Sequence, residues 1–129
     1  MRRDERAIQD GAVTSVLIVD DHPSFRSWAR RLLELSGFAV VGEAGDGKSA
    51  LSAVSDLRPD IVLLDVRLPD IDGFEVADRL AVLDSPPTVV LTSTADAADY
   101  RHRLTGAPVA GFVSKERLSA AAFSAVART

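Results

Sequence analysis

The sequence has no cysteine among its 129 residues, so disulfide bonds and thiolate metal sites are excluded. No apolar run approaches the roughly 20 residues that a membrane-spanning helix needs, and no signal-peptide core follows the charged N-terminus. A basic excess is also missing, because the net charge is -4 and the pI is about 5.1. These absences favour a cytoplasmic protein without membrane association, and the composition gives no indication of direct nucleic-acid binding.

The chain instead alternates apolar runs with amphipathic segments. Five runs predict strands, of which the first and third are expected to be fully buried: 15–19, 38–43, 60–64, 88–93 and 109–113. Helical periodicity between and after them predicts five helices: 23–35, 48–57, 73–83, 96–105 and 118–127. Residues 1–14 are polar and aperiodic, and we expect a flexible leader there, followed by one domain over 15–129.

This alternation predicts an α/β fold with a parallel sheet and helices on both faces. Right-handed crossovers make a doubly wound, five-stranded sheet in the flavodoxin-like order 2-1-3-4-5 the expected topology. Such sheets bind ligands at the carboxyl ends of their strands, beside the switch in strand order. Four polar residues fall at predicted strand ends of this kind: Asp20, Asp21, Asp65 and Ser93.

Acidic residues follow two of the predicted buried strands. Asp20 and Asp21 come after 15–19, and Asp65 comes after 60–64. A buried carboxylate is costly unless a partner accompanies it, and a hard cation such as Mg²⁺ prefers oxygen ligands. Helix capping could explain one acid of the first pair, but neither the second acid nor Asp65. The pattern therefore predicts one acidic, metal-binding pocket at an edge of the sheet.

Residues 15–127 resemble the receiver domains of bacterial two-component response regulators. Each matching segment is weak evidence by itself, but four occur in the family's order, each at the appropriate strand end. They are Val19-Asp20-Asp21-His22-Pro23, Leu64-Asp65-Val66-Arg67-Leu68-Pro69-Asp70-Ile71-Asp72-Gly73, Val90-Leu91-Thr92-Ser93 and Gly111-Phe112-Val113-Ser114-Lys115.

The resemblance implies a phosphoacceptor site. Asp65 would accept a phosphoryl group from a phosphohistidine, and Lys115 would pair with a phosphoryl oxygen. Asp21, Asp65 and the backbone carbonyl of Arg67 would bind Mg²⁺, while Asp20 would act mainly through a metal-bound water. His22, at a helix start, is expected to be an exposed residue rather than a ligand.

The family also uses a hydroxyl at the end of the fourth strand and an aromatic switch residue on the fifth. Counting back from Lys115 without a gap places the hydroxyl on Ser93, whereas counting forward from Pro87 places it on Thr92. We favour Ser93, because Gly111-Phe112 and Tyr100 also align with the family without gaps, and Phe112 then matches the aromatic switch position. Lys115 is followed by Glu116 rather than the family's frequent proline, so the loop into the last helix is expected to differ in shape.

The resemblance further implies partners and a switching role. The phosphodonor would be a sensor histidine kinase or a phosphotransfer protein, and a downstream output protein would read the fourth helix, fifth strand and last helix. The same face could form a homodimer, although packing on the sheet is the simpler explanation for the alanine-rich last helix. The domain would catalyse only its own phosphorylation and dephosphorylation. The dephosphorylation is expected to be slow, because Arg67 and Ala95 are unsuited to orient an attacking water.

Two alternatives belong to other functional classes. Residues 42–49 match the phosphate-binding loop pattern of nucleotide hydrolases. That interpretation puts Glu43 and Asp46 inside a loop meant to hold phosphate and leaves Asp20, Asp21 and Lys115 without a role. A receiver-like interaction module that has lost phosphorylation is the other alternative, but every residue type that the chemistry requires is present.

Overall fold

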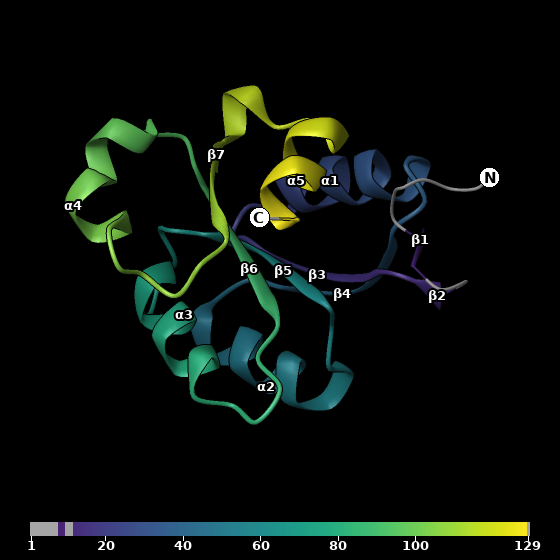
Figure 1. Cartoon of the computed structure of the whole chain (residues 1–129), viewed down its shortest axis with the longest axis horizontal. Coiled ribbons are helices and arrows are strands. Elements are labelled where there is room, and N and C mark those ends of the chain that lie inside the picture. The colour runs from purple at the N-terminus through teal and green to yellow at the C-terminus, as the bar shows by residue number, and fades with distance from the viewer. Residues whose placement is uncertain (1–7, 10–11, 129) are drawn as a thin grey trace.

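Five parallel strands form the central sheet of the computed structural model, which describes residues 8–9 and 12–128 (Figure 1). They are β3 (Ser15–Val19), β4 (Ala39–Ala44), β5 (Ile61–Asp65), β6 (Thr88–Ser93) and β7 (Gly111–Ser114). Their spatial order is β4-β3-β5-β6-β7. Counted among these five strands, the order is 2-1-3-4-5, so the predicted flavodoxin-like topology is confirmed.

Helices cover both faces of the sheet (Figure 1). They are α1 (Pro23–Leu35), α2 (Gly47–Leu57), α3 (Gly73–Ala81), α4 (Arg101–Leu104) and α5 (Ala120–Ala127), with 3₁₀ turns η1 (Ala97–Tyr100) and η2 (Lys115–Arg117). Figure 1 shows α1 and α5 on one face and α2 and α3 on the other. Within the described part of the chain, none of the helices has the length and apolar character that crossing a membrane requires.

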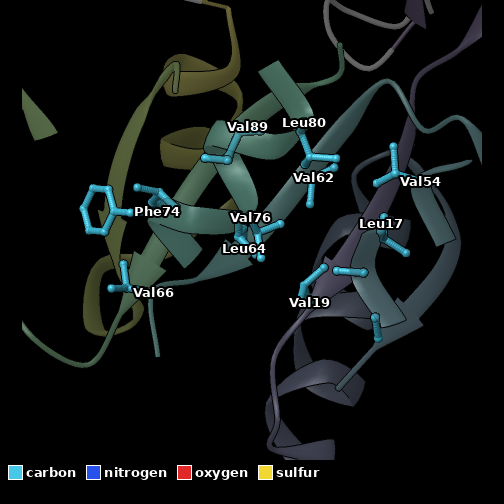
Figure 2. Packing of buried hydrophobic residues seen from close by; sticks show 14 residues of the cluster. Leu17, Val19, Val54, Val62, Leu64, Val66, Phe74, Val76, Leu80 and Val89 are labelled. Carbon is cyan, nitrogen blue, oxygen red and sulfur yellow. The ribbon is translucent and has the colours of Figure 1, made fainter. Parts of the chain in front are cut away.

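Apolar side chains on each face of the sheet pack against the covering helices. The β3 and β5 side chains alternate between the two faces, so both strands are buried throughout, apart from partly exposed Ser15. On the face of α2 and α3, Leu17, Val62 and Leu64 meet helix side chains such as Val76 and Leu80 (Figure 2). On the other face Phe123 of α5 is fully buried, which confirms that the last helix packs on the sheet.

Side-chain caps set the starts of three helices. The carboxylate of Asp46 accepts from the backbone N–H of Ser49 at the start of α2, and that of Asp72 accepts from Glu75 at the start of α3. The hydroxyl of Ser119 caps α5 in the same way, and Pro23 occupies the first turn of α1. These are the residue types that satisfy unpaired N–H groups at helix N-termini.

The structure differs from the sequence-based prediction mainly after β6. The fourth helix is not continuous over 96–105 but consists of η1 followed by the four residues of α4. Neither element buries a residue completely, so little apolar packing supports a longer helix. The fifth strand begins at Gly111 rather than at residue 109, and the last helix begins at Ala120 after η2.

The expected leader contains some secondary structure. Strands β1 (Ile8–Gln9) and β2 (Ala12–Val13) form a small antiparallel sheet directly before β3. Residues 1–7 and 10–11 of the expected leader lie outside the described residues. The flexibility of the leader therefore stays a prediction.

Candidate functional site

Two buried carboxylates and one ammonium group meet at the carboxyl edge of the sheet. Asp65 is the last residue of β5, and Asp20 directly follows β3, which pairs with β5. Lys115, directly after β7, reaches back across the edge. Its Nζ lies 2.5 Å from Asp20 Oδ2 and 3.3 Å from Asp65 Oδ2. The fold thus brings together three residues that are up to 95 positions apart in the sequence.

Asp20 is fully buried and is held in place by the start of α1. Its Oδ1 accepts a hydrogen bond from the backbone N–H of His22 at 2.8 Å. Its backbone carbonyl accepts one from Arg26 at 2.6 Å. Oδ2 has no hydrogen-bond partner of good geometry among the described residues, and only its ion pair with Lys115 offsets the cost of burial.

Asp21 and His22 complete the cluster on the solvent side. The Nδ1 atom of His22 lies 3.1 Å from Asp20 Oδ1 and 3.0 Å from Asp21 Oδ1. The His22 side chain is 65% exposed, as the sequence predicts. Its ring nitrogen nevertheless lies within the cluster, which the sequence analysis did not anticipate. The available signal was its position directly after two acidic residues at the end of a strand.

The donor set of this cluster fits a divalent cation. Ligand atoms of Asp20, Asp21, His22 and Asp65 all lie within 4.8 Å of one another. Carboxylate oxygens are the ligands that Mg²⁺ prefers, and the buried Oδ2 of Asp20 lacks a hydrogen bond. The backbone N–H of Arg67 orients the Asp65 carboxylate, because it donates to Oδ1 at 3.1 Å. Binding of the metal by the Arg67 backbone carbonyl stays a prediction.

Burial and the neighbouring charges shift the pKa values of Asp20, Asp65 and Lys115. Burial raises the pKa of Asp65 to about 6, against the opposing effects of the Arg67 N–H and of Lys115, and the neighbouring Asp20 carboxylate raises it further. Burial also opposes ionisation of Asp20, but its ion pair with Lys115 and the hydrogen bond from the His22 N–H outweigh that effect and lower its pKa. The two carboxylates outweigh burial at Lys115 and raise its pKa. Of the two buried carboxylates, Asp65 therefore has the less stabilised negative charge.

An aromatic ring supports the lysine. Nζ of Lys115 lies 4.4 Å from the centroid of the Phe25 ring, and the lysine side chain is only 13% exposed. A cation over an aromatic face gains electrostatic stabilisation, and the ring also limits where the flexible side chain can go. Helical periodicity in the sequence is consistent with Phe25 on the apolar face of α1, but it does not show that the ring faces the site.

The structure distinguishes the two candidate hydroxyls. Thr92 Oγ1 is buried and donates to the Val113 carbonyl at 2.6 Å, so this hydroxyl joins β6 to β7. Ser93 Oγ lies 3.1 Å from the hydroxyl of Tyr100 and accepts from the Ala95 N–H at 3.2 Å. The hydroxyl of Ser93 is thus the one whose partners lie in the loop beyond the strand, which favours Ser93 over Thr92.

A close backbone approach shapes the loop after Asp65. Gly73 N–H donates to the Val66 carbonyl at 2.7 Å. A Cβ on Gly73 would collide with the backbone oxygen of Asp65 and lie 2.9 Å from the Cα of Val66. Glycine at this position therefore lets the start of α3 pack directly on the end of β5.

The segment that matches the phosphate-binding loop is already occupied by a carboxylate. Asp70 accepts hydrogen bonds from the backbone N–H groups of Gly47 and Lys48, at 2.7 and 2.9 Å. These groups are the ones that would bind phosphate at the start of α2. Asp46 adds a second carboxylate as the N-cap of the same helix. The geometry therefore gives no support to a nucleotide hydrolase.

Comparison with known proteins gives consistent matches. A family model for the response regulator receiver domain matches residues 16–126. A protein described as a transcriptional regulator in Pseudomonas aeruginosa is 43% identical over 108 residues, which are 83% of this chain and 52% of that protein. The "probable transcriptional regulatory protein NarL" of Mycobacterium tuberculosis is 40% identical over 102 residues, or 78% of this chain and 47% of that protein.

Solved structures agree in fold. The signal receiver domain of the response regulator NarL from Mycobacterium tuberculosis superimposes with a TM-score of 0.81 at 35% sequence identity, covering 89% of this chain and 96% of that one. A LuxR-family two-component response regulator from Aurantimonas gives 0.74 at 30% identity, covering 81% and 75%. The chain spans about half the length of the curated relatives it matches.

Proposed function

Because the chain belongs to the response regulator receiver domain family, we propose that Asp65 is its phosphoacceptor and that Asp20, Asp21, Lys115 and Ser93 form the site around it. The observation that carries this proposal is the position of the Lys115 ammonium between the buried carboxylates of Asp20 and Asp65. A lysine held there can pair with the phosphoryl oxygens when a phosphoryl group is transferred to Asp65.

In the proposed reaction an Asp65 carboxylate oxygen attacks the phosphorus of a phosphohistidine. A P–O bond forms, the P–N bond breaks, and the imidazole leaves with the electron pair of that bond. Lys115 turns from Asp65 Oδ2 to a phosphoryl oxygen, and Ser93 donates its hydroxyl to another. Asp21, Asp65 and the Arg67 carbonyl would hold Mg²⁺, and Asp20 would act through a water; the bound ion would neutralise charge on the phosphoryl group.

A sensor histidine kinase or a phosphotransfer protein is the proposed phosphodonor, since a phosphohistidine is the donor that the family uses. The face formed by α4, β7 and α5 is the proposed output surface and homodimer contact. The matched region makes up about half of each relative named as a transcriptional regulator. These relatives give no support to the expectation that the protein avoids nucleic acid, and that expectation is not part of the proposal.

The decisive experiment is incubation with Mg²⁺ and acetyl phosphate, followed by intact-mass measurement. Addition of one phosphate is expected in the parent protein, and none in the isosteric variant Asp65→Asn. Omitting Mg²⁺ should abolish the addition. An equal adduct on Asp65→Asn, or no adduct on the parent, would contradict the assignment. ATP hydrolysis lost in Lys48→Ala would instead favour the nucleotide hydrolase.

The lifetime of the phosphate tests the roles proposed for Arg67 and Ala95. Neither side chain can orient an attacking water as a carboxylate or an amide does. We therefore expect slow self-dephosphorylation, measured as loss of the phosphate mass over time. A lifetime of seconds would contradict it, and Ala95→Gln should shorten the lifetime.

A further inference from the structure

The segment formed by η1 and α4 is attached to the domain by few side chains. Of its eight residues, none is buried, and only Tyr100 and Leu104 are even partly buried. Arg103 adds a surface contact, because its guanidinium lies 4.2 Å from the Phe74 ring centroid and pairs with Asp72 at 2.7 Å. Figure 1 shows α4 at the left of the view, set apart from α1 and α5. Moving a segment that is held by so few contacts requires little free energy.

Tyr100 is the contact that connects this segment to the site. Its ring packs between Phe74 and Phe112, with centroid distances of 5.9 and 5.8 Å. Its hydroxyl lies 3.1 Å from Ser93 Oγ, and Ser93 also accepts from the Ala95 N–H. Ser93 is itself 1% exposed. The proton that Ser93 would give to a phosphoryl oxygen is therefore the same one that it can share with Tyr100.

We propose that Tyr100 is a positioning residue that couples the Ser93 hydroxyl to the η1–α4 segment. In the unphosphorylated protein the Tyr100 hydroxyl holds Ser93 and anchors the segment. When Ser93 turns to a phosphoryl group on Asp65, Tyr100 loses this partner, and η1 and α4 are released from their present position. The proposal rests on the function proposed for Asp65 and Ser93, and it adds the residue that conveys the change to the output surface.

The coupling is reciprocal, as linkage requires. If Tyr100 competes for Ser93, removing only its hydroxyl should make the site bind a phosphoryl mimic more tightly. A net hydrogen bond of typical strength corresponds to about a three- to tenfold change in affinity. A ring that serves only for packing between Phe74 and Phe112 would give no such gain.

The chain has a single tyrosine, so protein labelled with 3-fluorotyrosine gives one fluorine NMR resonance, which reports on Tyr100. Ser93→Ala, without any phosphoryl group, should move this resonance. The matched control Thr92→Val, which deletes the adjacent hydroxyl, should not. Mg²⁺ with beryllium fluoride should move the parent resonance toward its position in Ser93→Ala and leave it unchanged in Asp65→Asn. An unmoved resonance in Ser93→Ala would overturn the coupling.

The variant Tyr100→Phe tests the reciprocal effect. Calorimetric titration with beryllium fluoride in the presence of Mg²⁺ should show about three- to tenfold tighter binding than in the parent protein. Equal or weaker binding by folded Tyr100→Phe would overturn the proposal. Uptake of phosphate from acetyl phosphate, measured by mass, distinguishes a failure of the coupling from a failure of the proposed phosphoacceptor function. Uptake with an unmoved fluorotyrosine resonance overturns only the coupling, whereas no uptake by the parent overturns the proposed function and the coupling with it.

Discussion

Replacing Asp65 with asparagine should stabilise the protein at neutral pH in the absence of Mg²⁺. The carboxylate is 3% exposed and lies in a cluster with Asp20, and burial raises its pKa to about 6. Asparagine has the same shape, and its side-chain oxygen still accepts the hydrogen bond that Arg67 N–H now donates to Asp65 Oδ1 at 3.1 Å. The substitution thus removes a poorly stabilised charge and keeps the local geometry.

The magnitude follows from the pKa of Asp65. A value of about 6 in the folded protein, against the ordinary 3.8, corresponds to about 3 kcal/mol, since one pKa unit is worth about 1.4 kcal/mol. Burial of the neutral asparagine amide also costs free energy, so the substitution gains less than this full amount. We therefore expect Asp65→Asn to raise the free energy of unfolding by about 1–3 kcal/mol at pH 7.5.

The pH dependence gives the prediction its sign. Because the pKa of Asp65 is higher in the folded state, the folded protein binds more protons than the unfolded chain between 3.8 and about 6. The contribution of Asp65 to stability therefore falls as the pH rises through that window. The advantage of the variant should be small near pH 4 and complete above pH 7.

Urea unfolding at several pH values, without divalent cations, measures this difference. Asp56→Asn is the matched control, because Asp56 is an exposed carboxylate in the last turn of α2, and it should change stability little. Adding Mg²⁺ should stabilise the parent more than Asp65→Asn, because the variant lacks one proposed ligand. Equal stability of Asp65→Asn and the parent at pH 7.5, or a difference that does not depend on pH, would refute the reasoning.

Four further substitutions test other parts of the structure. Gly73→Ala should lower the free energy of unfolding by about 1–3 kcal/mol or more, because its Cβ would meet the rigid backbone of Asp65; unchanged urea unfolding would contradict this close approach. Asp70→Ala should destabilise at pH 7, since N–H groups at the start of α2 lower the pKa of Asp70 to about 2. That difference should shrink as the pH falls from about 4 toward 2. Thr92→Val removes the hydrogen bond to Val113 and should lower stability, but phosphate uptake measured by intact mass should continue. Ser93→Ala should slow that uptake.

The sequence predicted the sheet well because strand burial leaves a strong local pattern. The runs at 15–19 and 60–64 are apolar on both faces, and the structure shows both strands covered on both faces by helices. The strand ends then place Asp20 and Asp65 at one edge without further assumptions, since neighbouring parallel strands end together. Lys115 was assigned through the resemblance to receiver domains, because its motif Gly111-Phe112-Val113-Ser114-Lys115 follows the fifth run.

The remaining details depend on contacts that no local pattern encodes. The expected helix over 96–105 is interrupted because its apolar residues, such as Tyr100 and Leu104, are only partly buried. The choice between Thr92 and Ser93 needed a hydrogen bond to Val113 across the sheet. Counting along the sequence gave two answers for this hydroxyl, and the hydrogen bond that occupies Thr92 favours Ser93.

The cluster that weakens the fold is also the one that suits the proposed chemistry. Asp20 and Asp65 lie buried near each other, and Lys115 is shared between them rather than paired with one. A site in which every charge was fully neutralised would have little to gain from a cation or a phosphoryl group. Here Asp20 already holds its charge at low pKa, while Asp65 does not. Under the proposed function, binding of a cation or transfer of a phosphoryl group would relieve the cost of burying the Asp65 carboxylate and would release Lys115. The stability lost at this edge would then be free energy that ligand binding recovers and converts into a shift between conformations.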